Sequence, residues 1–391
     1  MSEWQELNFC DLLIEPVRNG IYKEKSFHGR GTKIVNMGEL FSYPRLRNVP
    51  MKRLELNDNE RRKCLLNKGD LIFARRSLTA EGAGKCSIIK EIDEDTTFES
   101  SIIRARPNPE ITDSDFLYYL FNAPYGKYQL GTILRQVAVA GITGSDLMQL
   151  VLKVPCLDEQ KAIALVLSSL DDKIELFHRQ NTTLERMAET LFRQWFVEEV
   201  QEDWEVKTLK DEFDFTMGQS PAGSSFNENG VGIPMFQGNA DFGFRFPTER
   251  VYTTEPARFA ELMDTLISVR APVGAQNMAK VKCCIGRGLA AFRYKSNPNF
   301  YTYTYFKLRS LMEEIKQFNY EGTVFGSISK TDFENLVTSI PSDKDVLRFE
   351  NEAKPINDKI INNCEQIQTL EKLRDNLLPK LMSGDIRVKT N

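Results

Sequence analysis

Histidine is nearly absent from this chain of 391 residues: only His28 and His178 occur, and neither has ligand-type residues at the spacing of a zinc site. The seven cysteines form no CxxC pair, so free thiols in a reducing cytoplasm are expected. No run of about 18 apolar residues occurs, and the N-terminus lacks the apolar core of a signal peptide. The sequence therefore predicts a cytoplasmic protein with no membrane span.

An excess of charge of one sign is also missing. The net charge is −4, which excludes a uniformly basic coat for nucleic acid and requires any DNA binding to use local basic clusters. The stretch 158–200 is the acidic part, with 5 Lys or Arg against 9 Asp or Glu, which suits a protein partner. A hydrophobic content of 41% and a length beyond one ordinary core indicate a globular protein of two or more domains.

What the chain does contain is an internal repeat. Residues 146–191 align without a gap on residues 332–377, at an offset of 186 positions. The identities include Leu150 with Leu336, Pro155 with Pro341, and the run at 172–174 with the run at 358–360. The repeat predicts two halves of one plan, each a globular region followed by a long helix.

Short apolar runs between Gly, Pro and Asn turns indicate that each globular region is a compact α+β domain. In the first, a helix is expected at 114–121 with Asp113 or Ser114 as its cap. The strand at 266–270 matches the one at 71–75, which makes Arg270 the counterpart of Arg75. The predicted boundaries are 1–157 and 201–341 for the domains, and 158–200 and 342–391 for the helical segments.

The helical segments carry heptad patterns. Apolar residues alternate in steps of three and four, and Asn181 and Asn363 lie on the two seams, where buried asparagines fix register. Asp158 is the expected cap of the first helix, Pro355 is expected to start or kink the second, and Pro379 to disturb its last turn. We expect an antiparallel coiled coil of roughly 60 Å with a domain at each end and a pseudo-twofold axis. The alternative is two amphipathic helices, each packed on its own domain.

The order of motifs resembles the specificity subunit of type I restriction–modification systems over essentially the whole chain. The motifs are the entry to the first helix at 155–160, its end at 184–196, and the C-terminal run at 377–386. The opening of the second domain is similar too, with Gly218-Gln219-Ser220-Pro221 followed by Gly232-Ile233-Pro234. The first domain has Pro16–Gly20 instead, and the second helix lacks the Leu-x-Glu-Gln entry.

The resemblance implies a non-catalytic subunit that reads double-stranded DNA through two target-recognition domains. It implies that two methyltransferase subunits bind the helices and that nuclease/translocase subunits complete the enzyme. S-adenosylmethionine, ATP and magnesium would belong to those partners, with no cofactor in this chain.

Base edges are read by Arg, Lys, Asn or Gln, whereas phosphates accept any basic or hydroxyl donor. Arginines that follow a strand, loop lysines, and small hydroxyl residues before the closing strands are therefore the candidates for DNA contact. An N-capping role for Ser145 or Thr331 is the alternative for the hydroxyl residues. The predicted DNA-binding residues are Arg75, Arg76, Ser77, Lys85, Arg135, Thr143, Ser145, Gln219, Ser220, Arg245, Arg270, Asn277, Lys280, Arg287, Ser327, Ser329 and Lys330.

Two other classes of function stay open on the sequence. One is a protein scaffold whose coiled coil mediates interactions without DNA. The other is an enzyme with an unrecognised active site, but its signals are poor. Asn297-Pro298-Asn299-Phe300 departs from a methyltransferase loop, and the glycines at 82 and 84 lack the pattern of a phosphate-binding loop.

Overall fold

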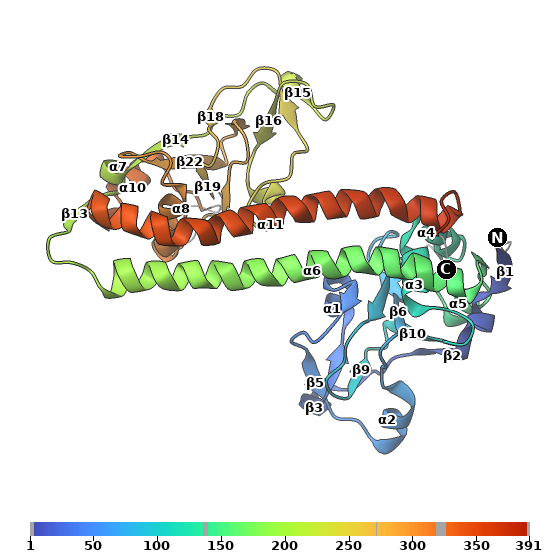
Figure 1. Cartoon of the computed structure of the whole chain (residues 1–391). Helices are drawn as coiled ribbons and strands as arrows, with labels where there is room; N and C mark the ends of the chain where they lie inside the picture. The colour runs from blue at the N-terminus through green and yellow to red at the C-terminus, as the bar shows by residue number, and fades with distance from the viewer. Residues whose placement is uncertain (1–3, 136–139, 271, 318–325, 389–391) are drawn as a thin grey trace. The chain divides into compact units, whose positions relative to one another are not determined.

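Two compact units share the two long helices of the chain. The computed structural model describes residues 4–135, 140–270, 272–317 and 326–388. Unit 1 comprises residues 1–173 and 370–391, and unit 2 comprises residues 174–369. Helix α6 (Leu157–Arg193) therefore begins in unit 1 and ends in unit 2, whereas α11 (Asp343–Ser383) begins in unit 2 and ends in unit 1 (Figure 1).

The domain of unit 1 is built around a five-stranded sheet with the order β2-β10-β6-β8-β4. Strand β6 (Leu71–Ala74) lies at its centre and is buried on both faces. The other strands of this sheet are β2 (Leu13–Asn19), β10 (Ile102–Pro107), β8 (Cys86–Ile89) and β4 (Arg45–Leu46). A three-stranded sheet joins β5 (Lys52–Leu54), β3 (His28–Val35) and β9 (Thr96–Phe98), and two small ladders pair β1 (Gln5–Asn8) with β12 (Val151–Val154) and β7 (Arg76–Ser77) with β11 (Ala140–Gly141).

Helix α3 (Ser114–Asn122) closes the core of unit 1. The Asp113 carboxylate accepts a hydrogen bond from the Phe116 amide at 2.9 Å, which confirms the predicted cap. Phe121 meets Phe9 and Phe73 edge-to-face, with ring centroids 5.0 Å apart in both pairs. The other helices of this domain are α1 (Met37–Ser42), α2 (Asp58–Cys64), α4 (Pro124–Thr132) and α5 (Gly144–Met148).

The domain of unit 2 follows a similar plan, but its two sheets contain different numbers of strands. Its four-stranded sheet has the order β14-β22-β19-β20, formed by β14 (Phe213–Met217), β22 (Leu289–Tyr294), β19 (Thr265–Ser268) and β20 (Gln276–Met278). A five-stranded sheet contains β15 (Phe226–Asn227), β17 (Tyr252–Thr253), β16 (Ile233–Phe236), β21 (Cys283–Ile285) and β18 (Phe259–Ala260). Strand β13 (Glu205–Thr208) pairs with β23 (Val337–Ile340), and the helices are α7 (Leu209–Glu212), α8 (Tyr301–Ser310), α9 (Met312–Gln317) and α10 (Lys330–Asn335).

Within each unit the two long helices run antiparallel. In unit 1 the Arg374 guanidinium donates to Asp171 at 2.8 Å, and Tyr119 of α3 donates to the same carboxylate at 2.6 Å. In unit 2 Phe349 packs edge-to-face on Phe192, with ring centroids 5.4 Å apart. The prediction of an antiparallel helix pair is thus confirmed inside each unit. The four predicted segment boundaries remain predictions.

The expected cap of the first helix was wrong, and the second helix does not start at Pro355, whereas a kink at Pro355 and a disturbed last turn at Pro379 remain predictions. Helix α6 begins at Leu157, so Asp158 lies in its first turn rather than capping it. Helix α11 begins at Asp343 and runs through both Pro355 and Pro379 to Ser383. Pro355 and Asn351, whose carbonyl loses its helical partner there, are both exposed, so water can satisfy that carbonyl.

The two seam asparagines pair with each other in unit 2. Both Asn181 and Asn363 are fully buried, and the Asn363 amide donates to the Asn181 carbonyl oxygen at 2.9 Å. Asn181 in turn donates to the Cys364 sulfur at 3.4 Å. This confirms that the predicted positions lie in the helix interface, where a polar pair disfavours other registers.

Asn363→Ala should therefore destabilise the chain by about 1–3 kcal/mol, because it leaves the buried side-chain oxygen of Asn181 without its hydrogen-bond donor. The double variant Asn181→Leu/Asn363→Leu should be close to neutral, since it removes both polar groups. Urea unfolding of the single and double variants measures the difference. Equal destabilisation in both would contradict a direct coupling of the two side chains.

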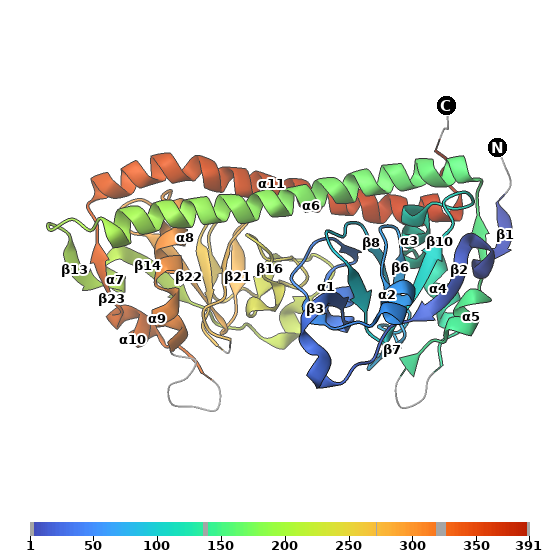
Figure 2. The same cartoon turned by 90° about the horizontal axis from the view of Figure 1, so that it is seen from below.

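None of the described helices is long and apolar enough to cross a membrane. In Figure 2, β7 and α5 of unit 1 lie at the side of their domain away from α6, and α10 of unit 2 lies on the corresponding side of its own domain. The segments that precede the closing strands β12 and β23 therefore lie on the side of each domain that faces away from the long helices, which we call its free end.

Candidate nucleic-acid interface

The hydrogen-bond pattern defines which residues of the two domains are equivalent. In unit 1 Gly141 pairs with Arg76, and in unit 2 Ser327 pairs with Arg270. Gly141 and Ser327 are related by the repeat offset of 186. Arg270 is therefore the counterpart of Arg76, not of Arg75 as the alignment of the two repeats within the sequence predicted. The one-residue error arose because both Arg75 and Arg76 are arginines, so composition alone could not fix the register.

Two arginines of unit 2 line one open hollow of about 590 Å³. Arg270 extends from the end of β19, and Arg287 lies in the turn before β22. Both side chains are exposed, and neither has an acidic partner among the residues that the structure describes. The remaining lining residues are Met217, Val269, Gly326, Ser327, Ile328 and Ser329. The hollow thus presents two unneutralised positive charges beside two hydroxyl groups, a combination that suits a polyanion.

The turn that carries Arg287 is held by its flanking glycines. A Cβ on Gly288 would lie 2.3 Å from the Gln237 backbone oxygen, so only glycine fits there, whereas a Cβ on Gly286 would lie 2.3 Å from the Gln237 side-chain oxygen and would displace that side chain. The Gly286 amide donates to the Phe236 carbonyl at 2.8 Å. The arginine is therefore displayed from a backbone that is fixed against strand β16.

Ser220 supports the same turn. Its hydroxyl donates to the Gln237 side-chain oxygen at 2.7 Å and accepts a hydrogen bond from the Arg287 amide at 3.3 Å. Gln219 precedes it, is exposed, and is fixed through its own amide, which donates to the Ile285 carbonyl at 3.0 Å. Of these two predicted DNA-binding residues, Ser220 therefore positions the turn, whereas Gln219 presents its side chain to solvent.

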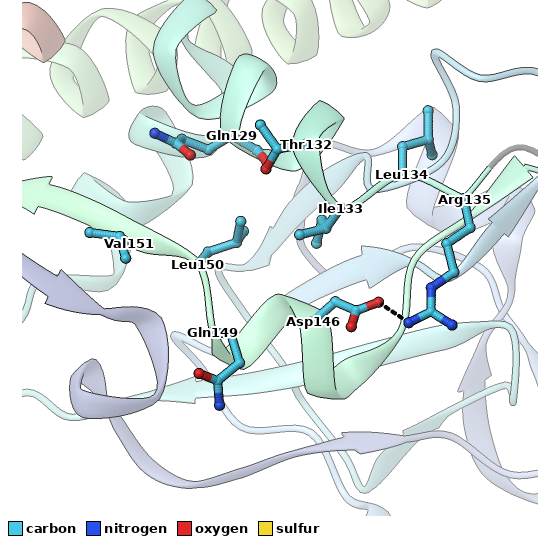
Figure 3. Close-up of a pocket in the computed structure, with 9 residues that line it drawn as sticks. All are labelled: Gln129, Thr132, Ile133, Leu134, Arg135, Asp146, Gln149, Leu150 and Val151. Carbon is cyan, nitrogen blue, oxygen red and sulfur yellow. Dashed lines mark hydrogen bonds and ion pairs between the residues drawn. The ribbon is translucent and has the colours of Figure 1, made fainter.

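Unit 1 displays a corresponding but different set of side chains. Arg76, Arg135 and Ser145 are exposed. Arg135 points across a hollow of about 510 Å³ to Asp146 and donates to its carboxylate at 2.7 Å (Figure 3). Arg76 has no acidic partner among the described residues. Arg76 is therefore the unneutralised positive charge on this side of unit 1, whereas Arg135 is already paired.

The hydroxyl residues before the closing strands act first as helix caps. Thr143 accepts a hydrogen bond from the Asp146 amide at the start of α5, and Ser329 accepts one from the Asp332 amide at the start of α10, both at 3.2 Å. The expectation that Ser145 or Thr331 caps these helices was wrong by two residues. Ser145 remains exposed and hydrogen-bonds to the Thr143 hydroxyl at 2.9 Å.

One predicted DNA-contacting residue, Arg245, is a structural ion-pair residue. Its side chain is 0% exposed, forms an ion pair with Glu185 of α6, and lies over the Tyr305 ring at 3.9 Å. A guanidinium enclosed in this way cannot reach DNA. The prediction for Arg245 was wrong because the sequence gives no sign that helix α6 covers it.

Asn277 faces inward, against its predicted contact with DNA, whereas Lys280 is half-buried and its predicted contact stays a prediction. Asn277 is fully buried and donates to the Gly243 carbonyl at 2.8 Å. Lys280 donates to Gln368 of α11 at 2.8 Å, so it joins the domain to the helix.

The side chains of the remaining basic candidates already form contacts within the protein. Lys85 donates to the Phe41 carbonyl at 2.9 Å, and partial burial lowers the pKa of its amine. Lys330 is exposed but contacts Glu334 at 3.3 Å, and Arg75 is half-buried beside Ser100. The Ser77 hydroxyl accepts a hydrogen bond from the Thr79 amide at 3.2 Å.

The alignment of the two repeats within the sequence did not identify an exposed aromatic residue of unit 1 as a candidate for DNA contact. Gly20 donates to the Ile102 carbonyl, and Gly218 makes the equivalent bond to Leu289, so Gly20 begins the counterpart of the Gly-Gln-Ser-Pro opening. Tyr22 consequently stands where unit 2 has Ser220, with its side chain 81% exposed. The available signal was a glycine at the end of the strand that follows Phe9, but the missing Ser-Pro concealed it.

Comparison with known proteins shows which family this chain is similar to. A family model described as "Type I restriction modification DNA specificity domain" matches residues 1–186 and 201–361. The chain is 30% identical to a putative type I restriction enzyme MjaX specificity subunit of Methanocaldococcus jannaschii, over 100% of this chain and 95% of the relative. It is 20% identical to the type I restriction enzyme HindI specificity subunit of Haemophilus influenzae, over 99% of this chain and 100% of the relative.

A solved structure has a similar fold. It is the S subunit of a type I restriction-modification system from M. genitalium, which superimposes with a TM-score of 0.64 at 17% sequence identity. The match covers 97% of this chain and 96% of that one. The chain therefore shares the fold of that subunit.

Proposed function

Because the chain belongs to the family of type I restriction–modification specificity subunits, whose members are non-catalytic, we propose that each of its domains reads one half of a bipartite double-stranded DNA target. The observation that carries the proposal is the equivalent placement of Arg76 and Arg270. Each exposed guanidinium follows a central buried strand at the free end of its domain and has no acidic partner among the described residues. Bidentate arginine contacts to guanine are the commonest specific contacts in the major groove.

The two surfaces share the hydrogen bonds that hold their turns on the central strands, but they differ in side chains and in loop length. Arg287 and Ser220 of unit 2 stand where unit 1 has Ser100 and Tyr22. Equivalent loops with different donors would dock alike on the DNA backbone but recognise different bases. This supports a target whose two halves differ in sequence.

The helices are the proposed attachment site of two methyltransferase subunits. Helix α6 leaves Leu165 69%, Met187 52% and Leu176 36% exposed. Exposed apolar side chains on a helix that already packs on its opposite face are suited to a protein partner. Nuclease/translocase subunits would join this assembly in the cytoplasm. S-adenosylmethionine, ATP and magnesium would be held by those partners.

The direct test is to purify the chain with its methyltransferase partner and to determine the modified motif from host DNA. DNA affinity measured against salt concentration should fall steeply, because phosphate contacts release counterions. The proposal would be rejected if the complex bound DNA without sequence preference, or if the modified motif were one continuous sequence and not two separated half-sites. If the chain assembles with protein partners but binds no DNA, the result would favour the alternative of a protein scaffold.

The helix pair is expected to set the gap between the two half-sites. Removing one heptad around Asn181 from α6, together with the facing heptad around Asn363 from α11, preserves the seam and shortens it by about 10 Å. At about 3.4 Å per base pair, the gap should shorten by roughly three base pairs while the bases read stay the same. The length-preserving double variant Asn181→Leu/Asn363→Leu is the control and should leave the gap unchanged. Altered half-site bases with an unchanged gap would contradict this role of the helices.

A further inference from the structure

Leu78 is the most exposed of the large apolar side chains that the structure describes, at 94%. It lies in the loop between β6 and β8, two residues after Arg76. The loop is closed by a hydrogen bond from the Gly84 amide to the Ala74 carbonyl at 2.8 Å, which encloses the nine residues 75–83. The equivalent bond in unit 2, from Gly274 to Ser268, encloses only the five residues 269–273. Unit 1 therefore extends further into solvent at this point, and Leu78 lies on the extension.

Hydroxyl groups of the extension itself form hydrogen bonds that restrict its conformation. The Thr79 amide donates to the Ser77 hydroxyl at 3.2 Å, and the Gly82 amide donates to the Thr79 hydroxyl at 3.3 Å. Gly82 packs so closely that a Cβ on it would lie 2.2 Å from the Ser77 oxygen. Because the loop is preorganised, presenting Leu78 to a partner costs little ordering entropy.

The charges around Leu78 favour a nucleic acid over a protein core or a lipid. Residues 75–85 contain Arg75, Arg76 and Lys85 against the single acid Glu81. Arg76 has no acidic partner among the described residues and lies in the short strand β7 directly before Leu78. An apolar side chain next to a free guanidinium matches a major groove in which a phosphate or guanine lies beside a methyl group.

We propose that Leu78 is the contact through which unit 1 recognises a thymine in its half of the DNA target. The thymine 5-methyl group is the apolar feature of the major groove, and it distinguishes T·A from the other base pairs. Arg76 would hold the neighbouring phosphate or base edge and so fix the distance of Leu78 from the groove floor. This inference rests on the proposed function, since it requires that unit 1 enters the DNA groove.

The test uses the full chain in complex with its methyltransferase partner and compares the wild type with Leu78→Ser. A serine at a position this exposed should leave the unfolding temperature unchanged, which separates a DNA effect from a folding effect. The modified motif should become degenerate at one position of one half-site, and that position should hold a thymine in the wild-type motif. Affinity for a duplex with the wild-type motif should fall about three- to tenfold.

The decisive comparison replaces that thymine with deoxyuridine, which removes only the methyl group. The wild-type complex should lose affinity on this duplex by a similar factor, whereas Leu78→Ser should bind the two duplexes equally. Leu262→Ser, which changes a 60% exposed leucine in unit 2, is the matched control and should behave as wild type. If the wild-type complex reads a bipartite motif that Leu78→Ser reads with equal affinity, this inference alone is overturned. If the wild type shows no sequence-dependent binding, the proposed function fails as well.

Discussion

Replacing Arg270 or Arg287 with alanine is expected to damage recognition of one half-site and to leave the other intact. Each guanidinium is exposed in the hollow of unit 2 and unneutralised by any described acidic residue. Losing a bidentate base contact costs about 1–3 kcal/mol, which is a roughly 5- to 150-fold loss of affinity for the correct sequence. The measurement is DNA affinity of the complex with its methyltransferase partner, combined with sequencing of the modified motif.

Arg250→Ala is the matched control for this experiment. Arg250 is also an exposed arginine of unit 2, with its side chain 61% exposed, but it is already paired with Asp241. It should therefore leave the motif unchanged. A loss that is equal for all DNA sequences in the Arg270 or Arg287 variants, with a weaker salt dependence, would assign the residue to a phosphate and contradict base reading.

Replacing Arg245 with alanine is expected to have the opposite profile, with a large loss of stability and no change in the bases read. Arg245 is enclosed between Glu185 of α6 and the Tyr305 ring, so its removal leaves a buried carboxylate without its partner. Breaking a buried ion pair from one side costs about 3–5 kcal/mol. Thermal or urea unfolding of the chain measures this cost.

The paired variant Arg245→Met/Glu185→Gln tests the assignment further. It removes both charges while keeping most of the volume, so it should recover most of the lost stability. If Arg245→Ala folds like the wild type but changes the modified motif, Arg245 is a DNA contact after all and the structural role is rejected.

The long helices could be predicted because their signal is local and periodic. Seam residues such as Asn181 and Asn363 repeat at heptad spacing, and the structure buries both. Helix ends were harder, because Pro355 reads as a helix start although its exposed position allows it within α11. Periodicity reports which face is buried, but it does not report whether water can satisfy a lost backbone bond.

The candidate interface could be predicted only in part, because exposure depends on packing between distant segments. Arg245 and Arg270 look alike in the sequence, yet one is covered by a helix that lies sixty residues earlier in the chain and the other is free. The choice between Arg75 and Arg76 depended on the hydrogen-bond ladder with Gly141. Leu78 gave no signal at all, since an apolar residue in a loop is ordinarily read as part of the core.

The glycine-flanked turn at position 287 has a consequence for how such a protein changes over time. Its conformation depends on the two glycines, Gln237 and backbone hydrogen bonds, and not on the arginine side chain. Substitutions at Arg287 are therefore expected to carry little folding penalty. Under the proposed function, a substitution at Arg287 would change the DNA sequence read by unit 2 and leave the fold intact. New restriction specificities would arise by substitution at a stable position, without an intermediate that fails to fold.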